Sequence, residues 1–168
     1  MNGLDRVREC MAEFLAGQGV EAITAWSDTS RKNADGAVCA VSLRKCQNLG
    51  AGFCDYLGER FNQDTGNWEE LYGRRVRLTF GLDLYAPAGH TAGESAIRAA
   101  FDTLSAALQS GGPVGLKLEE FSCGETGFDR AEGRYLCPVE AVYQAFLYAV
   151  ADEGGTFLDF EVKGVGQL

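Results

Sequence analysis

The stretch EELYGRRVRLTFGLDLYAP, residues 69–87, decides the fold of this chain. Every second residue from position 76 to position 84 is apolar, and the residues between them are polar, charged or small. The apolar set is Val76, Leu78, Phe80, Leu82 and Leu84, and the other set is Arg75, Arg77, Thr79, Gly81, Asp83 and Tyr85. Because side chains alternate between the two faces of a strand, this pattern predicts one long strand with one buried face.

The segments around this strand predict two helices and several more strands. Apolar residues at helical spacing predict helices over about 3–17 and 94–108, and glycines follow both runs. Strands are expected over 20–26, 37–47, 139–150 and 157–162. The spacing within 139–150 also fits a helix, but its valine and aromatic content favours a strand. We expect Phe101 and Leu104 to pack near Val76, Leu78 and Phe80.

These elements predict an α+β fold in a single domain over residues 1–168. It would contain a mixed, largely antiparallel sheet of four to six strands with two helices packed on one face. Two segments rich in glycine and polar residues, at about 48–68 and 111–135, are expected to form long loops. A chain of 168 residues, 46% of them hydrophobic, is long and apolar enough to bury such a core.

The chain is acidic, with a formal net charge of −9. This balance argues against sequence-specific nucleic-acid binding, which needs a basic stripe, and against an anionic membrane surface. The longest candidate for a membrane span, residues 136–151, is short and carries Glu140 and Gln144. The N-terminal segment carries charges throughout, unlike a signal peptide, so we expect the chain to stay in a reducing cytosol.

The six cysteines are predicted to be reduced, buried, small apolar residues that bind no metal. They are Cys10, Cys39, Cys46, Cys54, Cys123 and Cys137. No two of them have the spacing of a zinc knuckle, and a single histidine cannot complete a Cys/His ligand set.

Candidate catalytic groups are few. His90 is the one histidine, and no Gly-x-Ser-x-Gly motif supplies a serine nucleophile for it. The acidic cluster Glu119, Glu120, Glu125 and Asp129 could supply paired carboxylates, although acidic residues among glycines are more often a solvated loop. One alternative function is therefore a hydrolase that uses this cluster, or a cysteine with His90. We assign no catalytic, cofactor-binding or metal-binding residue and expect no enzyme.

Arginines and aromatic residues gather just before and within the start of the long strand. They are Trp68, Tyr72, Arg74, Arg75 and Arg77. This composition is typical of protein interfaces, so we predict a subunit interface here. The alternative is that the charges protect a sheet edge from unwanted pairing.

The chain resembles the tail terminator, or tail completion, proteins of tailed bacteriophages and prophages. The resemblance lies in GFCDYLGERF at 52–61, ELYGRRVRLTFGLDLYAP at 70–87, ESAIRAAFDTLSAAL at 94–108 and LCPVEAVYQAFLYAV at 136–150. It implies an α+β structural protein of the virion neck, with neither catalytic residues nor a cofactor. It also implies a ring, of six subunits, that caps the tail tube and joins it to the head.

The partners implied by this resemblance are further copies of the chain, the tail tube protein and the head–tail connector proteins. The protein would be found in the bacterial host cytoplasm during assembly and in the tail and neck of the virion. A small-molecule-binding α+β module is a further alternative.

Overall fold

The structure is a computed structural model that describes residues 3–24, 36–50, 55–64, 66–87, 93–131, 133–151 and 157–163. Both predicted helices are present, and so are the predicted strands at 139–150 and 157–162. The elements in chain order are α1 (Gly3–Gly17), β1 (Ala22–Ile23), β2 (Val38–Leu49), β3 (Tyr56–Asn62), β4 (Asn67–Pro87), α3 (Gly93–Gln109), β5 (Lys117–Cys123), β6 (Gly127–Asp129), β7 (Arg134–Cys137), β8 (Val139–Ala151) and β9 (Phe157–Lys163).

β4 is the long central strand of the sheet, and it pairs with other strands along both of its edges. One edge pairs with β2 and then with β3, and the other pairs with β7 and then with β8. The outer edge of β7 and β8 pairs with β6, β5 and β9. These pairs are antiparallel, whereas β1 lies parallel to β2. The prediction of a mixed, largely antiparallel sheet is thus confirmed.

The predicted count of four to six strands is wrong, because the sheet has nine. The path across it, β1-β2-β4-β7-β6, is only five strands wide. Of the remaining strands, β3 and β8 also pair with β4, and β5 and β9 pair with β8. Pro138 separates β7 from β8, and a proline has no N–H to give to a sheet. The segments expected to be long loops contain strands too: β3 lies within 48–68, and β5 and β6 lie within 111–135.

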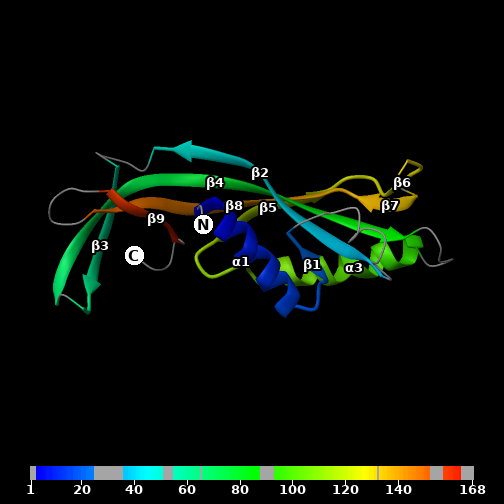
Figure 1. Ribbon diagram of the computed structural model, residues 1–168, viewed down its shortest axis with the longest axis horizontal. Helices are drawn as coiled ribbons and strands as arrows, with labels where there is room; N and C mark the ends of the chain where they lie inside the picture. Colours follow the sequence, from blue (N-terminus) through cyan, green and yellow to red (C-terminus); the bar gives the residue numbers. More distant parts are fainter. Residues whose placement is uncertain are drawn as a thin grey trace.

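The buried face of β4 is the one that its alternation predicts. Val76, Leu78, Phe80, Leu82 and Leu84 are all exposed by 2% or less. Figure 1 shows α1 and α3 on the same side of the sheet, and residues of both helices share one hydrophobic core with β4. Leu104 is fully buried in this core, whereas Phe101 packs against it only partly buried. None of the described helices is both long and apolar enough to cross a membrane.

The sheet extends well beyond the helices, which gives the molecule an elongated shape (Figure 1). At one end β3 and the first part of β4 form a two-stranded arm, defined here as residues 56–62 and 67–72. At the other end β6 and β7 form a short hairpin beside the start of α3. The helices cover the region between these ends, which we call the body.

Candidate interaction surfaces

The arm carries a stripe of exposed aromatic residues on one of its faces. Tyr56 lies directly opposite Tyr72, and Phe61 lies directly opposite Trp68. Directly opposite residues share a face, as do Trp68 and Tyr72, which are four residues apart on one strand. We call this set the aromatic stripe. Its members are exposed by 40% to 69%, and they are four of the seven exposed large hydrophobic residues among those described.

The two aromatic pairs have the edge-to-face geometry that aromatic rings prefer. The ring centroids lie 5.5 Å apart in Tyr56–Tyr72 and 5.6 Å apart in Phe61–Trp68, with interplanar angles of 64° and 63°. Such pairs contribute about 0.5–1.5 kcal/mol beyond the area that they bury. The rings are therefore held in place by the arm itself while much of their surface stays in water.

Two glutamates, Glu59 and Glu70, lie opposite each other between the aromatic pairs. Like charges in this position destabilise a strand pair. The hydroxyl of Tyr72 donates a 2.8 Å hydrogen bond to Glu70 Oε2, which partly offsets this cost. Partial desolvation, and then the two carboxylates, raise the pKa of Tyr56. The stripe is therefore both apolar and acidic, a combination that the stability of the arm alone does not require.

The structure separates the five residues predicted to form one interface. Trp68 and Tyr72 belong to the aromatic stripe, and Arg74 follows on the same face of β4. Arg74 Nη2 lies 2.8 Å from Asp55 Oδ2, which fixes its guanidinium within the subunit. Arg75 and Arg77 project from the opposite face, away from the helices. Because neighbouring residues of a strand face opposite ways, the three arginines are divided between the two faces of β4.

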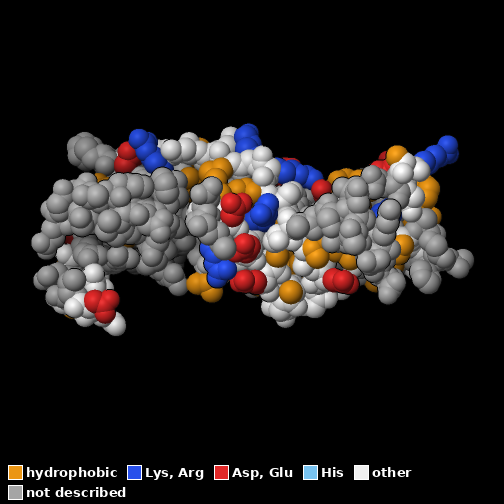
Figure 2. Space-filling view, in the orientation of Figure 1, with side chains coloured by type: hydrophobic (Ala, Val, Ile, Leu, Met, Phe, Trp, Pro, Cys, Tyr) orange, Lys and Arg blue, Asp and Glu red, His pale blue; other side chains and the backbone are white. Residues whose placement is uncertain are grey.

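The face of the sheet without helices carries a broad polar groove with a volume of about 870 Å³. The groove crosses β2, β4, β8 and β5, and its floor contains Thr79 and Val142, which are paired neighbours. Longer side chains surround these short ones, which explains the hollow. They are Arg44, Lys45, Gln47, Arg77, Lys117, Glu119, Glu120, Glu140 and Gln144. In Figure 2, basic side chains lie along the upper edge of the molecule, on the side away from the helices.

Two register shifts place charged residues beside this groove. β2 shifts its register on β4 between Leu43 and Lys45, and β5 shifts on β8 between Leu118 and Glu120. Arg44 and Glu119 are the extra residues at these shifts, and such bulges re-aim side chains. Arg77 Nε then lies 2.7 Å from Glu119 Oε2.

Arg44 of β2 forms hydrogen bonds with residues of both β4 and β8. Its Nη2 donates hydrogen bonds of 2.7 and 2.8 Å to the two carboxylate oxygens of Asp83, and its Nη1 donates one of 3.2 Å to Glu140. The guanidinium lies over Gly81, where an added Cβ would be 2.5 Å from Arg44 Nε. Partial burial lowers the pKa of Arg44, but the two carboxylates outweigh it and raise the pKa overall. Nothing in the sequence pattern predicted this network.

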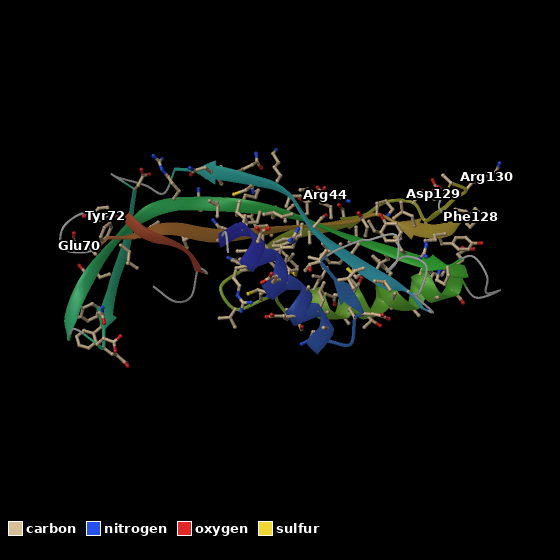
Figure 3. The ribbon with its side chains drawn as sticks, in the orientation of Figure 1. Arg44, Glu70, Tyr72, Phe128, Asp129 and Arg130 are labelled. Carbon is tan, nitrogen blue, oxygen red and sulfur yellow. The ribbon has the colours of Figure 1, made fainter. Side chains whose placement is uncertain are left out.

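The far end of the molecule has a smaller exposed aromatic group. Figure 3 places Phe128, Asp129 and Arg130 there, Glu70 and Tyr72 at the opposite end, and Arg44 between them. Phe128 makes an edge-to-face contact with Tyr135, at a centroid distance of 5.1 Å. Asp129 accepts a 2.9 Å hydrogen bond from the backbone N–H of Ala131, which stabilises the turn.

The candidate catalytic residues lie on separate elements or outside the described residues. Glu119 pairs with Arg77, and Asp129 stabilises the turn after β6, so the predicted acidic cluster is divided between separate elements. Across the described ranges, no group of three or more His, Cys, Asp or Glu residues is placed to hold a metal ion. His90 and Cys54 lie outside the described residues. The groove is lined mainly by charged and amide side chains rather than by the apolar residues typical of small-molecule pockets.

The prediction that the cysteines are buried holds for only part of the set. Cys39 and Cys137 are buried and free, and burial raises the pKa of Cys39 to about 12. Cys10 is half-buried, whereas Cys46 and Cys123 are exposed and free. Among the described residues, both exposed thiols lie at an edge of the sheet, where Cys46 of β2 pairs with Leu78 and Cys123 of β5 pairs with Val139. An apolar residue on a strand is buried only where other residues pack over it, so these two thiols stay exposed.

Four residues of this surface were not predicted from the sequence: Tyr56 and Phe61 of the aromatic stripe, and Glu59 and Glu70 between its two pairs. A signal was present, since YLGERF and WEELY place aromatic and acidic residues symmetrically around a Gly-containing turn. Comparison with protein-family models gave no match, and comparison with curated proteins gave no significant match.

Proposed function

We propose that this chain is a structural ring subunit of a phage or prophage tail, which terminates the tail tube and connects the tail to the head. The observation that carries the proposal is the arm, which extends past the core and holds an exposed aromatic stripe. Clustered exposed aromatic residues are enriched at protein interfaces. A strand pair that extends beyond the core lengthens the subunit rather than stabilising it. The two-helix α+β architecture is compatible with the resemblance in the sequence.

In this proposal the chain works by assembly and not by chemistry. It forms a ring of six subunits and contacts the tail tube protein on one side and head–tail connector proteins on the other. Assembly takes place in the host cytoplasm, and the finished ring stays in the neck of the virion. The surfaces that would make these contacts are the stripe on the arm and the groove on the helix-free face.

The test is binding to tail tubes of the phage or prophage whose genome encodes the chain. The wild-type protein should sediment with purified tubes, and particles that lack it should have tails that are not joined to heads. The double variant Phe61→Ala/Trp68→Ala should lose binding while remaining folded. Leu4→Ala is the matched control, because Leu4 is also exposed, at 42%, but lies on α1. Normal head–tail joining in particles without the protein would contradict the proposed function.

A further inference from the structure

The aromatic stripe and the polar groove are two exposed surfaces with complementary properties. The aromatic stripe is exposed and apolar, and it is acidic at its centre, where Glu59 faces Glu70. The groove is concave, and its lining has four basic residues, Arg44, Lys45, Arg77 and Lys117, against three acidic ones, Glu119, Glu120 and Glu140. An excess of positive charge is unexpected in a chain whose net charge is −9. The groove is therefore suited to an acidic partner.

Not all of the cations in the groove are available to a partner. Arg44 is held by Asp83 and Glu140, and Arg77 is held by Glu119. Lys45 and Lys117, by contrast, form no ion pair with any described residue. They lie on β2 and β5, at the two sides of the groove. Three strand spacings, or about 14 Å, separate β2 from β5 across the groove, which is wide enough for a two-stranded hairpin.

The stripe and the groove cannot satisfy each other within one copy. The residues of β4 in the hydrophobic core have even numbers, and so do Trp68, Glu70 and Tyr72 of the arm. The groove residues Arg77 and Thr79 have odd numbers. The two surfaces therefore belong to opposite faces of the same sheet. A contact between them needs a second copy and is heterologous, which means that it repeats from one copy to the next.

We propose that the arm of one copy docks in the groove of a second copy, with Glu59 and Glu70 facing Lys45 and Lys117. The aromatic rings cover the short residues of the groove floor, Thr79 and Val142, and lose water on contact. Charge pairs at such a contact set its register and partner more than its affinity. The proposal rests on the proposed function, because it names the self-contact from which a ring would be built.

The test uses two charge reversals measured by sedimentation velocity and mass photometry. Variant one is Glu59→Arg/Glu70→Arg, which makes both the arm and the groove positive. Variant two is Lys45→Glu/Lys117→Glu, which makes both negative. Each variant alone should associate at least about tenfold more weakly than the wild type, because both of its surfaces carry like charges. An equimolar mixture should recover association, since every contact between one variant and the other joins opposite charges.

The matched control is Arg98→Glu/Arg130→Glu, which changes the same number of exposed charges away from both surfaces. It should associate like the wild type, and circular dichroism should show that all variants are folded. A wild-type protein that stays monomeric up to about 1 mM would overturn the proposal, because a contact weaker than about 4 kcal/mol cannot build a ring. Unchanged association in either reversal, or no recovery in the mixture, would overturn it as well.

The same variants separate failure of the inference from failure of the proposed function. If the variants behave as expected in solution but heads and tails join normally without the protein, the docking contact stands and the phage role fails. If joining needs the protein but variant one supports it like the wild type, the docking contact fails and the phage role stands.

Discussion

The arm and the body use the same face of the same strand in opposite ways. In the body, the even-numbered residues of β4 from Val76 to Leu84 are buried under α1 and α3. On the arm, Trp68 and Tyr72 continue this face but are exposed by 69% and 47%. The strand is continuous, so the difference comes from what covers it. Alternation in the sequence defines a face, whereas the helices decide whether that face becomes core.

The two regions also differ in the residues that occupy this face. The body has aliphatic residues and Phe80, which have no polar atoms to satisfy. The arm has tyrosine, tryptophan and glutamate, which combine an apolar surface with polar groups. A face of the second kind is stable in water and can still lose water against a partner. This contrast supports the proposal that the body folds the chain and that the arm binds another protein.

The largest expected effect is in the body. Leu104→Ala should lower the free energy of unfolding by about 2–5 kcal/mol, because a fully buried leucine leaves a cavity. Phe101→Ala should cost less, since Phe101 is only partly buried. Guanidinium denaturation followed by circular dichroism measures both. A loss under about 1 kcal/mol for Leu104→Ala would mean that α3 does not form the core with β4.

Gly112 tests how tightly the body is packed. A Cβ at this position would lie 2.6 Å from the ring of Tyr143, which is buried edge-to-face against Phe80. Gly112→Ala should therefore cost about 1–3 kcal/mol through overpacking, measured by the same denaturation. Gly127→Ala is the control, because a Cβ there would meet nothing within 4 Å. Equal costs for the two variants would show that the effect arises from the backbone and not from packing.

The sequence predicted the body far better than the surfaces. The period of two in β4, the helical spacing before Gly17 and the valine-rich run in β8 are local patterns, and each was confirmed. The network of Arg44, Asp83 and Glu140 joins residues that are far apart in the chain, so only the strand register brings them together. Likewise, no pattern within β2 predicts that Cys46 is exposed at an edge of the sheet. Local periodicity reports the direction of a side chain but not its tertiary partner.

Because of Tyr143, the free energy of unfolding should depend on pH in the alkaline range. Its hydroxyl is buried and finds no hydrogen-bond partner among the described residues, and burial raises its pKa above the usual value of 10.0. A raised pKa in the folded state means that stability is fully present below pH 10 and is lost as the pH rises above it, by up to about 1.4 kcal/mol per pH unit.

Tyr143→Phe should remove this alkaline component and raise the free energy of unfolding at pH 7 by about 1 kcal/mol, because it removes an unsatisfied hydroxyl. Urea denaturation at a series of pH values between neutral and strongly alkaline measures both effects. Tyr56→Phe on the arm is the comparison, since the Tyr56 ring is exposed by 40%. If the two variants show the same pH profile, the alkaline loss does not originate from Tyr143.

The smallest expected effect on stability is on the arm, and it tests the comparison most directly. Trp68 is the most exposed residue of the stripe, so Trp68→Ala removes little buried area and mainly the edge-to-face contact with Phe61. The free energy of unfolding should fall by no more than about 1.5 kcal/mol, which is the upper range for such an aromatic pair. The monomer should keep its circular dichroism spectrum and its cooperative transition.

Association should respond much more strongly than stability to this substitution. Large aromatic side chains in the middle of an interface often account for 2 kcal/mol or more of binding, or about thirtyfold in affinity. Trp68→Ala should therefore weaken self-association by about that factor while the unfolding transition hardly moves. A loss of stability as large as that of Leu104→Ala would show that Trp68 packs inside the subunit. The stripe would then be part of the core, and the arm would not be a surface kept for a partner.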